Sequence, residues 1–238
     1  MRNEVENYLR YLADMGEKDL PVGEIEAAQC KAEVQSAPEK VRQKVPAEDK
    51  GRLLGELAKQ IARCTKCELH RTRTNTVPGA GNPDADIMFI GEAPGADEDA
   101  TGIPFVGRAG KLLDKFLAAI DIDRDEVFIA NVLKCRPPNN RDPLPSEEAA
   151  CMPYLLRQIE IIQPKIICCL GRVAAQALLK TKAPLSKMRG QMFSFHSIPM
   201  IVTYHPAAVL RNDRLKRFVM DDLRFLMSKY EEILEGEG

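Results

Sequence analysis

Residues 86–90 read DIMFI, and this short apolar run is the first of four along the chain. The other three are VFIANVL at 127–133, KIICCL at 165–170 and PMIVTY at 199–204. Amphipathic segments that predict helices lie near 51–62, 108–120, 146–162, 172–180 and 213–234. This alternation of apolar strands and amphipathic helices predicts an α/β fold, namely a three-layer α/β/α sandwich around a central, mostly parallel sheet of four strands.

The places to look for chemistry follow from this fold class. In open parallel sheets, ligands bind beyond the carboxyl ends of the strands. The segments in question are 91–107, 131–135 and 205–212.

Composition narrows the class of protein. Of 238 residues, 45% are hydrophobic and 29% are charged, which is close to the globular average and excludes collagen-like, coiled-coil and wholly disordered chains. No apolar run approaches the roughly 20 residues that span a bilayer. The N-terminus is charged throughout and has no export signal. We therefore expect a soluble, cytoplasmic protein with no membrane partner.

Composition also divides the chain. We expect residues 1–50 to form a short helix and a flexible linker, residues 51–230 to form the folded domain, and residues 231–238 to form an acidic tail. The N-terminal arm is read either as a local docking segment or as a peptide that recruits a protein partner. The net charge of the chain is −1, yet residues 51–230 carry 26 basic and 20 acidic side chains. The net positive charge of residues 51–230 is compatible with binding to the phosphate backbone of a nucleic acid.

The loop after the first strand is rich in Gly, Pro and acidic residues, and it is not a phosphate loop. The best local match to G-x-x-x-x-G-K-[ST] starts at Gly102 and lacks both the Lys and the hydroxyl. Phe105 stands in this loop between Pro104 and Val106. Its ring either fills the core or forms a platform on which a planar base stacks.

Two further strand ends carry polar side chains. Asn131 either caps a turn or uses its amide, which is both donor and acceptor, to read the O4 and N3–H edge of uracil. His205 ends the last strand beside a basic cluster, unlike His70 and His196, which we interpret as structural. Arg211 and Arg214 in that cluster are either a solvated helix start or phosphate contacts.

Four cysteines form a separate candidate site for a metal or a cluster. Cys64-x-x-Cys67 is followed by the isolated Cys135 and Cys151, in a chain of seven Cys with no export signal. A single C-x-x-C joined by two isolated Cys is an acceptable ligand set for an iron–sulfur cluster, whereas structural zinc usually has two paired knuckles. A thioredoxin-like redox pair is disfavoured because no strand precedes the motif.

Taken together, these residues resemble those of the family 4 uracil-DNA glycosylases, which carry a [4Fe–4S] cluster. The resemblance covers roughly residues 60–228. The motifs that carry it are Gly91-Glu92-Ala93-Pro94-Gly95, the segment from Asp97 to Gly110, Asn131-x-x-Lys134-Cys135-Arg136-Pro137-Pro138 and His205-Pro206-Ala207. The family's cluster ligands fall on Cys64, Cys67, Cys135 and Cys151.

The resemblance implies a role for each matching position. Asn131 would read the uracil edge, Phe105 would stack on the flipped base, and His205 would hydrogen-bond to the O2 side of the departing uracil. Backbone groups from Gly91 to Ala93 would contact the base, and Glu98 is a candidate for lining the pocket near C5. The cluster would be structural and would bring Lys134 and Arg136 toward the DNA, with Arg211 and Arg214 as further DNA contacts.

The implied reaction is monofunctional hydrolysis of the N-glycosidic bond, which leaves an abasic site for base excision repair. Related families place Asp or Asn where Ala93 stands, so the adjacent Glu92 is only a candidate base. We expect a monomer. Two alternatives stay open: a non-catalytic DNA-binding module of the same fold, and an α/β hydrolase, which the absence of G-x-S-x-G disfavours.

Overall fold

The computed structural model describes residues 45–236, and this part of the chain is built around a six-stranded sheet. The strands are β1 (Ala80–Gly81), β2 (Ile87–Gly91), β3 (Phe128–Asn131), β4 (Ile166–Leu170), β5 (Met192–Phe195) and β6 (Ile198–Thr203). Their order in the sheet is β1-β3-β2-β4-β6-β5, and the four central strands are parallel. The short strands β1 and β5 pair antiparallel at the two edges.

The predicted α/β fold class is confirmed, whereas the predicted number of strands was too small. The four apolar runs are the four central strands, which are buried almost throughout. The two edge strands gave no such signal, because β1 has only two residues and β5 alternates between exposed and half-buried positions.

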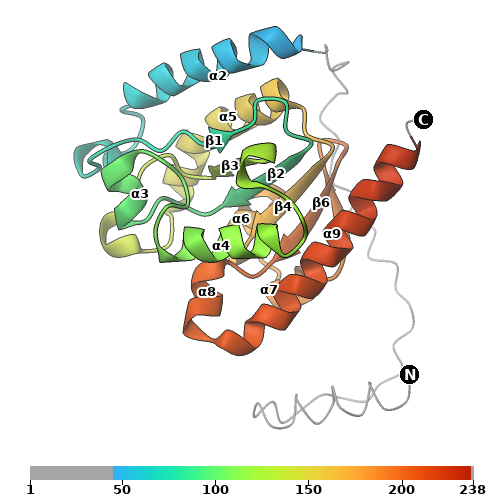
Figure 1. Cartoon of the computed structure of the whole chain (residues 1–238). Coiled ribbons are helices and arrows are strands. Elements are labelled where there is room, and N and C mark those ends of the chain that lie inside the picture. Colours follow the sequence, from blue (N-terminus) through green and yellow to red (C-terminus); the bar gives the residue numbers. More distant parts are fainter. Residues whose placement is uncertain (1–44, 237–238) are drawn as a thin grey trace. The chain divides into compact units, whose positions relative to one another are not determined.

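Helices cover both faces of the sheet (Figure 1). On one face lie α4 (Arg108–Ala118) and α9 (Lys216–Gly236); on the other lie α5 (Pro145–Ile162), α6 (Arg172–Leu179) and α7 (Leu185–Met188). The side chains of neighbouring residues in a strand point to opposite faces of the sheet. Met88 therefore belongs to the core under α5, and Phe89 belongs to the core under α4. The helix α2 (Ala47–Ala62) packs on α5 through Leu57 and Ile61.

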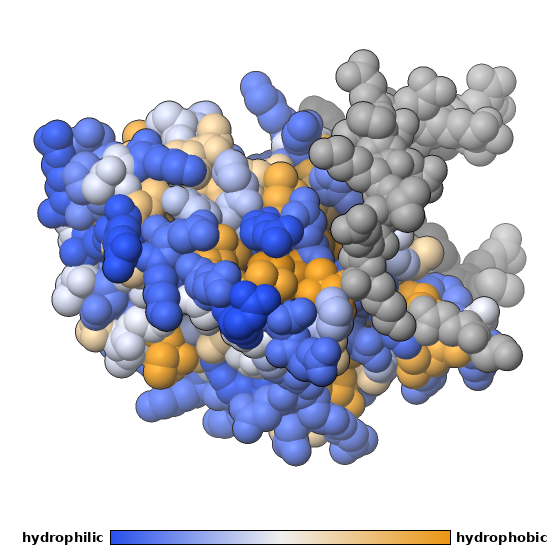
Figure 2. All heavy atoms as spheres, turned by 90° about the horizontal axis from the view of Figure 1, so that it is seen from above, coloured by the Kyte–Doolittle hydropathy of each residue, from blue (hydrophilic) through white to orange (hydrophobic). Residues whose placement is uncertain are grey.

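Seen from the α2 side, hydrophilic residues cover most of the surface and hydrophobic residues form separate patches between them (Figure 2). Within the described range, no helix is long and apolar enough to cross a membrane.

The ends of the described part differ from the expected domain boundaries. Helix α2 begins at Ala47, before the expected domain start, and α9 continues through residues 231–236, which were expected to form a separate acidic tail. The predicted N-terminal helix and most of the linker lie outside the described residues.

Candidate active site

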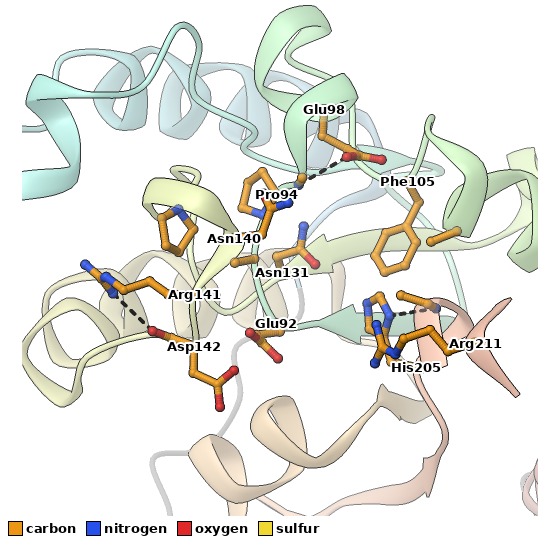
Figure 3. Close-up of a pocket in the computed structure, with 15 residues that line it drawn as sticks. Glu92, Pro94, Glu98, Phe105, Asn131, Asn140, Arg141, Asp142, His205 and Arg211 are labelled. Carbon is orange, nitrogen blue, oxygen red and sulfur yellow. Dashed lines mark hydrogen bonds between the residues drawn. The ribbon is translucent and has the colours of Figure 1, made fainter. Parts of the chain in front are cut away.

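A cavity of about 360 Å³ opens at the carboxyl edge of the parallel strands. Glu92 follows β2, Asn131 ends β3, and His205 stands two residues after β6. Phe105 comes from the loop between α3 (Ala96–Thr101) and α4. The three segments singled out from the sequence thus meet around one cavity (Figure 3).

Asn131 lies deep in this cavity, and its side-chain oxygen is unsatisfied. The residue is 2% exposed, and its Oδ1 atom is buried with no hydrogen-bond partner among the described residues. A buried acceptor of this kind costs free energy unless a donor reaches it. The cavity is therefore arranged to receive a ligand that offers an N–H or O–H group to Asn131.

Gly91 allows this arrangement because it has no side chain. It lies beside Asn131 in the register of β2 and β3. A Cβ atom at Gly91 would stand 2.3 Å from Asn131 Oδ1 and 2.7 Å from Phe105 Cζ. Any larger residue would displace the amide and the ring that define the cavity.

The Phe105 loop is held by the carboxylate of Glu98. Its Oε2 atom accepts the backbone N–H of Gly95 at 3.1 Å, and its Oε1 atom accepts those of Val106 and Gly107 at 2.9 Å each. Phe105 is 5% exposed and has a φ of 52°, a left-handed conformation that is uncommon for a bulky residue. Glu98 lines the cavity, and its carboxylate is engaged in holding the loop.

His205 is held as a neutral hydrogen-bond donor. Its Nδ1 atom accepts the backbone N–H of Ala207 at 3.1 Å, so the neutral ring carries its proton on Nε2. Burial, with a smaller effect of the Arg211 charge, lowers the pKa of His205 to about 4. The His205 ring lies 5.4 Å from the Phe105 ring, centroid to centroid.

The end of β6, two residues before His205, is anchored by an ion pair that the sequence did not reveal. Thr203 Oγ1 donates to Asp222 Oδ2 at 2.6 Å, and Arg189 donates to both Asp222 oxygens at 2.7 and 2.8 Å. Arg189 also stacks over the Tyr204 ring at 4.7 Å. The two residues before His205 are thereby held by Arg189, which follows α7, and by Asp222 of α9.

Glu92 is an acid of the cavity whose pKa is strongly shifted. No hydrogen bond to its carboxylate is present in the part of the chain that is described. Burial raises the pKa of Glu92 to about 7; Asp142 and Glu148 raise it too, while Arg172 lowers it. A carboxyl group with a pKa near neutrality exchanges protons readily at pH 7.

The four cysteines lie in one region. Cys135 and Cys151 are buried beside Leu69 and Leu133, and Cys67 packs against them. All four thiols are free, and Arg73 links two of the cysteines by donating to Cys135 Sγ at 3.3 Å and to the Cys64 carbonyl at 2.9 Å. In the described range, no group of three or more His, Cys, Asp or Glu side chains is arranged to hold a metal ion.

The predicted DNA contacts fall into two groups. Arg211 and Arg214 are exposed, and Arg136 is half-buried and donates to Asn140 Oδ1 at 2.7 Å. Lys134, in contrast, is 1% exposed, and its Nζ atom donates to the Asn131 carbonyl at 2.7 Å and to Gln158 Oε1 at 2.6 Å. The prediction that Lys134 contacts DNA is therefore corrected, because its side chain turns inward and supports the backbone of Asn131.

Comparison with known proteins gives the family. A model of the uracil DNA glycosylase superfamily matches residues 78–224, and the chain belongs to this superfamily. It is 48% identical over 179 residues to a type-4 uracil-DNA glycosylase of Archaeoglobus fulgidus, which covers 72% of this chain and 90% of that protein. It is 44% identical over 190 residues to the type-4 uracil-DNA glycosylase of Thermotoga maritima, covering 78% and 97% respectively. The type-4 resemblance inferred from the motifs is thus confirmed.

Replacing Glu98 tests how the Phe105 loop is held. Glu98→Gln keeps one acceptor oxygen, so at least one of the three backbone N–H groups loses its partner. We expect faster hydrogen exchange at Gly95, or at Val106 and Gly107, and a loss of about 1.5–3 kcal/mol in unfolding free energy. The control is Asp97→Asn, an exposed neighbour on the same helix turn. Unchanged exchange in Glu98→Gln would contradict this role.

Proposed function

We propose that this protein excises uracil from DNA by hydrolysing the N-glycosidic bond, which leaves an abasic site. The observation that carries the proposal is the unsatisfied Oδ1 atom of Asn131 in a cavity beside the Phe105 ring. Membership of the uracil DNA glycosylase superfamily and the names of the type-4 relatives support it.

Uracil fits the chemistry of the Asn131 amide. Its N3–H group is a donor for Oδ1, and its O4 atom is an acceptor for the Nδ2 group. Cytosine presents the opposite pattern on this edge, so it would leave two buried polar groups mismatched. The Phe105 ring supplies a stacking surface for the flipped base, and the backbone from Gly91 to Ala93 borders the base on another side.

His205 acts on the leaving group. As the bond between C1′ and N1 breaks, its electron pair stays on uracil, and negative charge builds on O2. The neutral His205 ring donates its Nε2–H to that oxygen, in a site where burial strengthens the interaction. The nearby Arg211 charge favours the same anion.

Water completes the reaction at C1′, and we assign its orientation to Glu92. The ionised carboxylate accepts a hydrogen bond from the water and takes its proton as the new C1′–O bond forms. The support for this role is the place of Glu92 in the cavity and its pKa near 7.

A [4Fe–4S] cluster bound by Cys64, Cys67, Cys135 and Cys151 is part of the proposal. Four free thiols gathered in one region fit a cluster, which spreads its ligands further apart than a single ion does. One sulfur already accepts an N–H group, since Arg73 donates to Cys135 Sγ at 3.3 Å. Cys64 and Cys67, Cys135 and the α5 residue Cys151 would hold the cluster, which would tie these three segments together.

We further propose that Arg136, Arg211 and Arg214 contact the DNA backbone. Their charge supports this role: Arg211 lines the cavity, Arg214 is exposed, and the half-buried Arg136 precedes Pro137, which lines the cavity. A monomeric state, a cytoplasmic location and a recruiting role of the N-terminal arm stay predictions of the sequence.

Excision is tested with an end-labelled oligonucleotide that carries one uracil, beside matched thymine and cytosine strands. We expect alkali-dependent scission at uracil alone. His205→Asn keeps an acceptor for the Ala207 N–H but loses the Nε2 donor, so its rate should fall about 10²–10³-fold. The matched control is His196→Asn in the turn between β5 and β6. If the cluster-replete protein binds DNA but excises nothing, it is a non-catalytic binding module.

Methylated uracils test the Asn131 contact. A methyl group at N3 removes the donor for Oδ1, whereas a methyl group at N1 occupies the place of the sugar. We expect 1-methyluracil to inhibit excision as uracil does, and 3-methyluracil to bind about tenfold to a hundredfold more weakly. In Asn131→Ala the two isomers should bind alike. Equal inhibition by both isomers in the wild type would exclude the contact.

The pH dependence tests Glu92. Because its pKa is raised to about 7, the group is a neutral acid below that pH and a proton-accepting carboxylate above it. The single-turnover rate should therefore rise as the pH increases through about 7, while His205 stays neutral over this range. Glu92→Gln should be slower and lose this rise. A variant that keeps the wild-type profile would remove Glu92 from the reaction.

Metal analysis tests the cluster. We expect about four iron and four acid-labile sulfide atoms per chain, with broad visible absorbance. Cys151→Ala should lose much of the iron, whereas Cys168→Ala, in the buried strand β4, should keep it. One zinc ion per chain without sulfide would contradict the assignment.

A further inference from the structure

The exposed face of α4 carries a row of basic side chains that the predicted DNA contacts do not include. Arg108, Lys111 and Lys115 are three and four residues apart, so they lie on one side of the helix. All three are exposed, and none of them has an ion-pair partner among residues 45–236.

Two acidic residues near the row are engaged in other ion pairs. Asp114, the acidic residue of α4, forms an ion pair with Arg124 at 2.7 Å. On the facing segment, Asp213 is paired with Lys216 at 2.6 Å. The positive charge of the α4 row is therefore not neutralised by these neighbours.

The row is continuous with the cavity. Ala109, the residue after Arg108, lines the cavity, and so does Arg211 at the end of α8 (Pro206–Arg211). Between α4 and α8 lies a shallow depression of about 200 Å³, bordered by the three basic residues and by Leu112 and Leu210. Figure 1 shows α4 and α8 next to each other at the same side of the sheet.

The length of the row suits a regular polyanion. Seven residues of helix separate Arg108 from Lys115, which is about 10 Å along the axis. One strand of DNA rises about 3.4 Å per nucleotide, so this length spans about three phosphates. A track of this kind needs evenly spaced negative charges, which a nucleic acid backbone supplies.

We propose that Arg108, Lys111 and Lys115 form a phosphate-binding track that holds the DNA backbone next to the flipped nucleotide. This inference rests on the proposed function, since it takes DNA as the substrate of the adjoining cavity. The track binds any sequence, because it reads charge and spacing alone. It positions the strand while the cavity recognises the base.

The test is the salt dependence of DNA binding by the full chain with its cluster. Fluorescence anisotropy with a uracil-free duplex gives the slope of log K against log salt, which changes by about 0.9 for each phosphate contact. Lys111→Gln combined with Lys115→Gln should reduce the magnitude of this slope by about 1.8. Adding Arg108→Gln should bring the reduction to about 2.7.

The matched control removes two positive charges from the opposite face of the sheet, by Lys59→Gln on α2 and Arg157→Gln on α5. Its slope should equal that of the wild type. If the α4 double variant fails to fold, the single variants should each reduce the slope by about 0.9.

The outcomes separate the two proposals. A slope unchanged in the α4 variants, or reduced equally in the control, overturns the track, even if the wild type excises uracil. A reduced slope in the α4 variants alone supports the track. If that result comes with a wild type that excises nothing, the surface stands as a DNA-binding site and the proposed enzymatic function fails.

Discussion

The Glu98 carboxylate organises the cavity, because it meets the beginnings of two helices at once. It accepts the N–H groups of Gly95, which precedes α3, and of Gly107, which precedes α4. Both helix starts have unsatisfied N–H groups and a positive dipole end, so one anion stabilises both. The chain between them must then close a tight loop. Phe105 takes up the strain of that loop in its left-handed conformation and turns its ring over Gly91.

The parallel sheet supplies the second constraint, since it sets which residues can face that ring. Gly91 and Asn131 are partners in the register of β2 and β3. The Asn131 amide therefore stands beside a glycine, which has no side chain to displace it. The Lys134 Nζ atom donates hydrogen bonds to the Asn131 carbonyl and to Gln158 Oε1. Burial lowers the pKa of Lys134 to about 7. A long polar side chain thus lies inside the protein, where it fixes the backbone of a residue that lines the cavity.

The sequence was informative where one local property decides the structure. Buried parallel strands are continuous apolar runs, so the four central strands could be predicted, and residues directly after them could be placed at one edge. Side chains whose role depends on partners far away in the sequence could not be placed in this way. Lys134 follows a strand as a surface residue would, and only its contact with Gln158, 24 residues away, shows that it turns inward. Nor could the Arg189–Asp222 pair be found, because 33 residues separate two charges that meet inside the fold.

Burial explains why two titratable groups of one cavity behave in opposite ways. Burial lowers the pKa of His205 to about 4, because desolvation disfavours its cation, and raises the pKa of Glu92 to about 7, because it disfavours its anion. Near pH 7 the cavity therefore holds a neutral donor at His205 and, at Glu92, a carboxyl group that is partly ionised. A neutral donor serves a departing anion without first giving up a proton, and a partly ionised acid can accept one from water. Both groups line one cavity at the ends of strands that the sheet holds in parallel, so the same burial acts on a base and on an acid.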